Sequence, residues 1–225
     1  TDPPKYVPAD EYLSGNVRQK LQIAELAAKS DSEFQANVEA LKQVIPKDLT
    51  AAEINVRLGV TWIPPQDIKR FILDTFSPSF YAAREIKVRL SPFSGEWFIE
   101  NKSADNMNII AFNSLGTERA SAYRLLEDAL NLKETRIYDY IVESDGSKKA
   151  VFNAKETMAA QAKQELIKQA FKDWIWKDPE RRERLTRYYN DTFNSVRPRE
   201  YDGSHIHFVG MNPEITLRPH HVNAI

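Results

Sequence analysis

The fold of this chain is decided by the helical stretch NAKETMAAQAKQELIKQAFKDWIWKDPERRERLTRYYNDTF, which occupies residues 153–193. Asn153 followed by Glu156 is typical of a helix start, because both side chains can bind free N–H groups of the first turn. The pattern predicts one long helix to about residue 177. Asp178 as N-cap and Pro179 at the first helical position predict a second helix. The stretch therefore predicts a helical hairpin over residues 154–194.

Helical patterns also dominate the N-terminal part of the chain. Apolar residues recur at helical spacing from Val17 to Ala28, from Phe34 to Ile45 and from Ile68 to Phe76. Pro64-Pro65 predicts the start of the last of these helices. We therefore expect a helical part over residues 13–80.

Two further helix starts are predicted from single caps. Thr50 and Glu53 form a capping box, which predicts a short helix to about Leu58. Thr117 predicts the start of a helix that carries Leu125 among its apolar residues.

Strand patterns appear between the two helical parts. Ile86, Val88 and Leu90 alternate with charged residues, which is typical of a half-buried strand. Asp145-Gly146 predicts a hairpin turn, because glycine tolerates a positive φ. Expected strands cover residues 86–90, 96–100, 108–113, 136–142 and 149–152. The fold class is α+β, with a helical N-terminal part, a small mixed β-sheet with a packed helix, and a C-terminal helical hairpin.

These elements divide the chain into five expected segments. They are an extended linker over 1–12, the helical part over 13–80, a small α/β part with a hairpin over 81–153, the helical hairpin over 154–194, and an irregular segment over 195–225.

Composition excludes several classes of protein. The 225 residues are 42% hydrophobic and 28% charged, as in an ordinary globular protein. Cysteine is absent, which excludes disulfides and thiolate metal sites. We see no apolar run long enough to span a membrane and no leader, so we expect a cytoplasmic protein without a membrane partner. The chain starts at Thr1 and ends inside an expected helix, which suggests a piece of a longer protein.

Motifs that bind nucleotides or activate a serine are missing from the sequence. There is no Gly-x-x-x-x-Gly-Lys-Ser/Thr loop, no Gly-x-Gly-x-x-Gly and no Gly-x-Ser-x-Gly. Only seven glycines are present, so little is available to build a phosphate-binding loop. We expect no catalytic residue and no cofactor in this chain.

Local charge is most informative over residues 163–200, although the whole chain carries a net charge of −1. Ten basic and seven acidic residues give this segment a charge of +3. Cations can neutralise phosphates and aromatic rings can stack on bases. The candidate nucleic-acid-binding residues are Lys172, Lys177, Arg181, Arg182, Arg184, Arg187 and Trp176. The alternative is a solvated helix pair whose aromatic residues, such as Phe171 and Trp174, form the core.

Two weaker motifs lie near the ends of the chain. Asp2-Pro3-Pro4-Lys5 is similar to the Asp-Pro-Pro-aromatic loop of amino-group methyltransferases, but a Pro-rich linker is the simpler interpretation. His205 and His207 could place two imidazoles on one side of a strand. The carboxylates or further histidines of an open metal site do not accompany them in a recognised spacing, so polar surface is the simpler interpretation.

Several longer motifs, taken together, resemble one family. They occur in order at residues 11–21, 57–64, 116–117, 153–157, 162–164, 171–176, 178–182, 189–190, 193–194 and 199–205. The chain resembles the segment between the methyltransferase and helicase domains of very large bacterial DNA methyltransferase–helicase proteins, which occur on mobile elements and phages. Their helicase is of the superfamily-2, Snf-like type.

The resemblance implies a role as part of a larger protein. The parent would use S-adenosylmethionine and ATP, and residues 195–225 would lead into the first helicase lobe. His221 stands where the family usually has the glutamine that reads adenine, and an imidazole cannot present the amide's paired donor and acceptor. Implied partners are DNA and the flanking domains.

Two functions remain open from the sequence. The first is a noncatalytic connector that also engages DNA through the segment 163–200. The second is a purely structural scaffold between two enzymes, with no DNA affinity. A free-standing enzyme would need a catalytic cluster that the sequence does not present.

Overall fold

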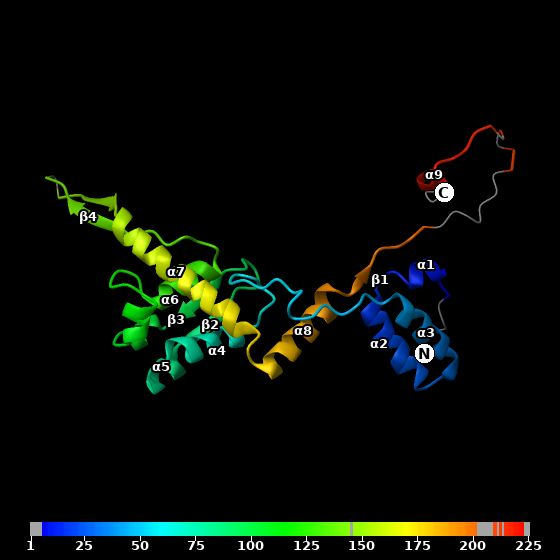
Figure 1. Ribbon diagram of the computed structural model, residues 1–225, viewed down its shortest axis with the longest axis horizontal. Helices are drawn as coiled ribbons and strands as arrows, with labels where there is room; N and C mark the ends of the chain where they lie inside the picture. Colours follow the sequence, from blue (N-terminus) through cyan, green and yellow to red (C-terminus); the bar gives the residue numbers. More distant parts are fainter. Residues whose placement is uncertain (1–5, 145, 202–208, 211, 213, 223–225) are drawn as a thin grey trace. The chain divides into compact units, whose positions relative to one another are not determined.

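The computed structural model describes residues 6–144, 146–201, 209, 210, 212 and 214–222 (Figure 1). The chain forms two compact units. Unit 1 combines Thr1–Thr50 with Arg187–Ile225, and unit 2 is Ala51–Thr186. The first and last parts of the chain therefore fold together, which the segment boundaries drawn from the sequence did not anticipate.

Unit 1 is built around the predicted N-terminal helices. Its cluster of buried apolar residues contains Val17, Ala24, Val38 and Leu41, which come from two helices that lie side by side (Figure 1). Its elements are α1 (Ala9–Tyr12), β1 (Gly15–Asn16), α2 (Val17–Ala28), a 3-10 turn η1 (Ser32–Phe34), α3 (Gln35–Val44), the end of α8 (Pro179–Phe193), β6 (Val196–Arg197) and α9 (Pro219–Val222).

Unit 2 is larger and combines helices with two strand pairs. Its elements are α4 (Pro65–Phe76), α5 (Phe80–Glu85), β2 (Lys87–Leu90), β3 (Trp97–Glu100), a 3-10 turn η2 (Lys102–Asp105), a π-helix η3 (Ile110–Ser114), α6 (Ala122–Leu130), β4 (Tyr138–Val142), β5 (Lys148–Phe152), α7 (Ala154–Ile175) and the start of α8.

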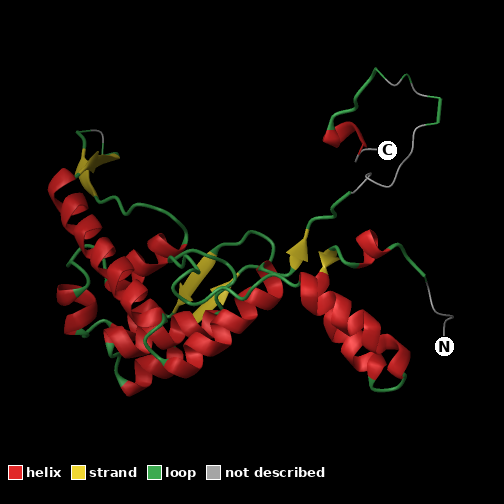
Figure 2. Ribbon diagram, turned by 45° about the vertical axis from the view of Figure 1, so that its right-hand side comes forward, coloured by secondary structure: helices red, strands yellow, loops and turns green. Residues whose placement is uncertain are grey.

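The α+β class is confirmed, and the strands form separate pairs (Figure 2). In the described residues β1 pairs with β6, β2 with β3 and β4 with β5, each antiparallel. One small mixed sheet is therefore not formed. The hairpin turn at Gly146 has the expected positive φ of 80°, whereas Asp145 lies outside the described residues.

The core of unit 2 is aromatic. Phe71 lies 5.3 Å from Phe171 and 6.1 Å from Phe76, measured between ring centroids, and all three are fully buried. Phe76 in turn lies 5.2 Å from Tyr123. Edge-to-face contacts at these distances are favourable because the positive ring edge meets the negative ring face. These ring contacts explain why apolar residues recur at helical spacing in α4 and α7.

The short helix predicted over residues 50–58 is wrong. The chain forms turns from Ala51 to Ile54 and then runs without helix to Arg57. Ile54, Val56 and Leu58 are buried while the residues between them are exposed. This period of two places alternate side chains in the core, and it outweighs the capping signal of so short a segment.

The strand expected over residues 108–113 is a π-helix instead. Asn108 explains the difference, because its Oδ1 accepts hydrogen bonds from the N–H groups of Ile110 (2.8 Å) and Ala111 (3.1 Å). Gly116 closes the same loop. A Cβ there would lie 2.1 Å from the carbonyl oxygen of Ala111, so only glycine fits.

Two helix starts also differ from the expectation. The helix predicted from Thr117 begins at Ala122, where Ser121 is the N-cap and accepts from the N–H of Arg124. Thr117 instead closes a turn by accepting from the N–H of Ala120 at 3.0 Å. Within the expected linker 1–12, residues 9–12 form α1, because Pro8 precedes two acidic residues in its first turn.

Candidate nucleic-acid interface

The helix starts predicted at Asn153 and Asp178 are confirmed, but α7 and α8 meet at a corner and do not pack along each other as a helical hairpin would. Asn153 caps α7 by accepting from the N–H of Glu156 at 3.0 Å. Asp178 caps α8 by accepting from the N–H of Arg181 at 2.7 Å, and Pro179 is the first residue of that helix. The corner therefore places the predicted basic residues on the last turn of α7 and the first turns of α8.

Arg181 is part of the fold rather than the surface. It is 9% exposed, and its guanidinium lies 3.4 Å from the ring centroid of Trp174. Its Nε donates to the carbonyl of Ile175 at 2.9 Å, and its second terminal nitrogen donates to the carbonyl of Trp174 at 2.6 Å. Burial lowers the pKa of Arg181, against the opposing effect of Asp178. Arg181 thus caps the C-terminal carbonyls of α7 and is not free for a phosphate.

Arg184 is bound to a buried carboxylate of α4. Its guanidinium lies 2.6 Å from Oδ1 of Asp67, whose side chain is almost fully buried. Oδ2 of Asp67 is also buried and has no hydrogen-bond partner. Removal of Arg184 would leave this carboxylate without its counter-charge, so the pair fixes α8 to α4.

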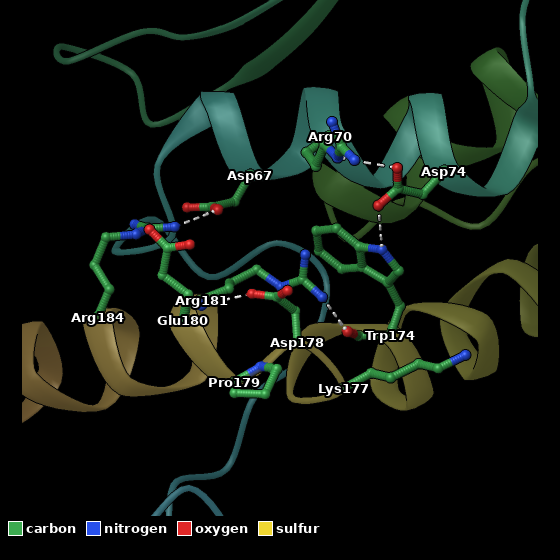
Figure 3. Close-up of a pocket in the computed structure, with 10 residues that line it drawn as sticks. All are labelled: Asp67, Arg70, Asp74, Trp174, Lys177, Asp178, Pro179, Glu180, Arg181 and Arg184. Carbon is green, nitrogen blue, oxygen red and sulfur yellow. Dashed lines mark hydrogen bonds and ion pairs between the residues drawn. The ribbon is translucent and has the colours of Figure 1, made fainter.

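The groove beside these residues carries both signs of charge (Figure 3). It measures about 730 Å³ and is open to solvent. Asp74 accepts from Trp174 Nε1 at 3.0 Å and from Arg70 at 2.9 Å. The lining residues are Asp67, Arg70, Asp74, Trp174, Lys177, Asp178, Pro179, Glu180, Arg181 and Arg184. Four carboxylates against four cations do not make a phosphate-binding surface.

The other predicted residues are divided between paired and unpaired side chains. Arg187 lies 3.0 Å from Asp191, one turn further along α8. Trp176 is half-buried. Lys172, Lys177 and Arg182 are exposed and make no ion pair within the described part of the chain. These three cations are what remains of the predicted patch, and we call them the free cations.

A second feature, which the sequence did not reveal, joins the two segments of the chain that form unit 1. β1 pairs with β6, so Gly15 is the partner of Arg197 and Asn16 of Val196 (Figure 2). The N–H of Val17 extends this ladder by donating to the carbonyl of Ser195 at 3.0 Å. We use the name neck for this strand pairing together with the hydrogen bonds of Arg18, Asn190 and Asn194.

Arg18 is the central side chain of the neck. It is almost fully buried. Its Nε donates to the carbonyl of Asn194 and a terminal nitrogen donates to the carbonyl of Pro46, both at 2.8 Å. The same nitrogen lies 2.5 Å from Oδ1 of Asp48. One guanidinium therefore binds residues 46–48 and Asn194, two segments that lie far apart in the sequence.

Two asparagines complete the neck from the end of α8. Asn190 accepts from the N–H of Leu49 at 2.8 Å and donates to the carbonyl of Leu49 at 2.9 Å. Asn194 donates to the carbonyl of Lys47 and to Oδ1 of Asn190, both at 2.8 Å. Asn190 is fully buried and Asn194 is half-buried. Their spacing of one helical turn is the only sequence signal for this contact, because amides on one side of a helix need partners when they are buried.

Metal and membrane features are absent from the described residues. No group of three or more His, Asp or Glu side chains could hold a metal ion there. His205 and His207 lie outside the described residues, as does the motif at residues 2–5. His221 is exposed in α9, with its ring 4.1 Å from that of His220. None of the described helices has the length and apolar character needed to span a bilayer.

These observations define a small α+β module with a closed neck, a mixed-charge groove and three free cations. Residues 57–195, more than half of the chain, match the family described as domain of unknown function DUF8437. The chain belongs to that family. Neither the curated proteins nor the solved structures contain a match to this chain.

Proposed function

We propose that this chain is a noncatalytic connector module of a large DNA methyltransferase–helicase protein. The sequence resemblance supports the parent protein, and the neck is the observation that supports the connector. In this proposal the flanking domains bind S-adenosylmethionine and ATP and carry out the chemistry. The parent protein is proposed to be cytoplasmic. His221 differs from the adenine-reading glutamine of the family, so ATP recognition belongs to residues of the helicase domain.

The neck makes a connector geometrically possible. Gly15 and Arg197 are paired strand residues, so chain segments before and after them leave from one place. Antiparallel partners have Cα atoms about 4.5–5.5 Å apart. Residues 17–195 then loop out between two neighbouring points. Domains joined at these points would keep a short and constant spacing, whatever the size of the loop.

Energy transfer between the ends of the chain tests the connector. A donor and an acceptor fluorescent protein are fused to the first and last residues of the intact chain. A closed neck gives efficient transfer, and Arg18→Met together with Asn190→Ala lowers it by opening the neck. Arg187→Met is the matched control, because its ion pair with Asp191 lies outside the neck. Low transfer in the unchanged chain would contradict the proposal.

Sequencing the gene on both sides of the region that encodes this chain tests whether the chain is part of a methyltransferase–helicase protein. We expect the reading frame to continue upstream into methyltransferase motifs and downstream into helicase motifs. A frame that closes on both sides without them would remove the parent from the proposal and leave the neck untouched.

DNA engagement is a second candidate, favoured by the free cations Lys172, Lys177 and Arg182. Neutralising a phosphate releases counterions, so binding should weaken with salt. Fluorescence anisotropy with labelled duplex, at about 50 and 200 mM salt, measures this. Changing all three residues to alanine should reduce affinity and lower the salt slope by about one for each phosphate that is no longer neutralised. Changing the exposed Lys29, Arg57 and Lys87 removes the same charge as a control. No binding at low salt would favour the pure scaffold.

A further inference from the structure

The β4–β5 ribbon presents an unusual face. It is a separate two-stranded pair at the N-terminal end of α7 (Figures 1 and 2). The register pairs Tyr138 with Phe152, Tyr140 with Ala150 and Val142 with Lys148. Because side chains alternate along a strand, these residues share one face. We call it the aromatic face: Tyr138, Tyr140, Val142, Lys148, Ala150 and Phe152.

The aromatic face is open to solvent. Tyr140 is 70% exposed, Val142 63% and Phe152 51%. Tyr138 and Phe152 support each other across the strands, with ring centroids 5.8 Å apart. Contiguous exposed apolar side chains of this kind mark interaction sites in soluble proteins.

The base of the ribbon is fixed to the rest of unit 2. Arg119 lies 2.8 Å from Asp139 and donates to the carbonyl of Tyr138 at 3.0 Å. Asn153 donates through its side chain to Asp139 at 2.7 Å and through its N–H to the carbonyl of Ile137 at 2.9 Å. These contacts hold the aromatic face in one orientation, which a stacking surface requires.

The charges of the ribbon lie on different faces. Asp139 and Glu143 belong to the opposite face, and each has a cation beside it: Arg119 at 2.8 Å and Lys149 at 3.3 Å. Lys148 is the one charged residue of the aromatic face, and it makes no ion pair within residues 6–144 and 146–201. The aromatic face therefore combines exposed rings with a positive charge.

We propose that the aromatic face is a stacking platform for unpaired bases of single-stranded DNA, with Lys148 contacting a backbone phosphate. Bases stack on aromatic rings regardless of sequence, and a nearby cation tracks the backbone. Tyr138 and Tyr140 are two residues apart on one strand, so their rings follow each other at about 7 Å along it. The platform is separate from the free cations and adds a preference for single strands. It rests on the proposed DNA engagement for the identity of the ligand.

Anisotropy of a fluorescein-labelled oligothymidine of about 15 nucleotides tests the platform on the whole chain at low salt. Tyr140→Ala should weaken binding by about tenfold, because it removes one stacking ring. Tyr140→Phe keeps the ring and should retain the affinity. Phe93→Ala removes another exposed aromatic side chain, outside the ribbon, and should change nothing.

Photocrosslinking locates the bound bases independently of affinity. An oligonucleotide with 5-iodouracil should crosslink to peptides that contain Tyr138, Tyr140 or Phe152. Equal affinity of Tyr140→Ala and the unchanged chain, or crosslinks confined to other segments, would overturn the platform. The absence of oligothymidine binding at low salt would also overturn the platform. A third contradicting result would be that Tyr140→Ala abolishes self-association of the chain but leaves DNA binding unchanged. Energy transfer across the neck would be unaffected by these outcomes, so the connector would stand or fall separately.

Discussion

Unit 2 is stabilised by buried aromatic rings, whereas the two segments of the chain that form unit 1 are joined by hydrogen bonds. The largest fully buried side chains of unit 2 are Phe71, Phe76, Trp97, Tyr123 and Phe171. In unit 1 the apolar cluster comes from residues 12–45, and hydrogen bonds of Arg18, Asn190 and Asn194 join residues 17–49 to residues 190–195. The difference suggests that unit 2 can stay folded when the neck opens. The proposed connector would then open and close its neck while unit 2 stays folded.

The largest effect is expected in the aromatic core. Phe71→Ala should lower the free energy of unfolding by about 3–5 kcal/mol, because it removes a fully buried ring and leaves a cavity. Urea denaturation measures this loss. A loss below about 1 kcal/mol would show that unit 2 does not depend on its aromatic core.

The second-largest effect distinguishes the stability of unit 1 from that of unit 2. Arg18→Met should cost about 2–3 kcal/mol, because the carbonyls of Asn194 and Pro46 lose a charged donor. Hydrogen exchange should show the loss in unit 1 and leave the amides of unit 2 protected. Arg187→Met, which breaks one exposed pair, should stay within about 0.5 kcal/mol. Equal loss of protection in both units would remove the distinction between them.

A smaller effect tests the reassignment of Arg181. Arg181→Lys should cost about 1–2 kcal/mol, because an ammonium cannot reproduce both carbonyl contacts and the stack on Trp174. Thermal melting measures the cost, while affinity for duplex should not change. A variant that lost DNA affinity at unchanged stability would restore Arg181 to the interface. Replacing Arg181 and Arg184 with acidic residues would therefore destabilise the fold, so a loss of DNA binding in that variant would not identify a DNA-binding residue.

The smallest effect concerns the exposed pair of Asp10 and Arg199. The hydrogen bond from Arg199 lowers the pKa of Asp10 below its ordinary value. A carboxyl with a lowered pKa in the folded state stabilises fully above its ordinary pKa and loses this contribution as the pH falls through the lowered value. NMR titration should show the low pKa of Asp10, and Arg199→Gln should return it toward normal. An unchanged titration in that variant would assign the shift to another group.

Local signals in the sequence predicted most of the long helices, but the caps at Thr50 and Thr117 and the strand over residues 108–113 were wrong. The caps at Asn153 and Asp178, and the apolar spacing of α2, α4 and α7, act within a few residues and are confirmed. Arg181 could not be placed, because its burial depends on carbonyls freed at the end of another helix. The neck could not be predicted either, since strands of two residues carry no periodicity and their partners lie at opposite ends of the chain.

The closed neck is tested most directly by a disulfide across it, since the native chain has no cysteine. Asn16 and Val196 are strand partners, and antiparallel partners have Cα atoms within the range of a disulfide, about 4.4–6.8 Å. Asn16→Cys with Val196→Cys should form an intramolecular disulfide in the monomer under mild oxidation. Asn16→Cys with Arg197→Cys, whose side chain points to the other face, is the control and should oxidise more slowly. Equal rates in the two variants, or crosslinks only between chains, would contradict the closed neck and the connector built on it.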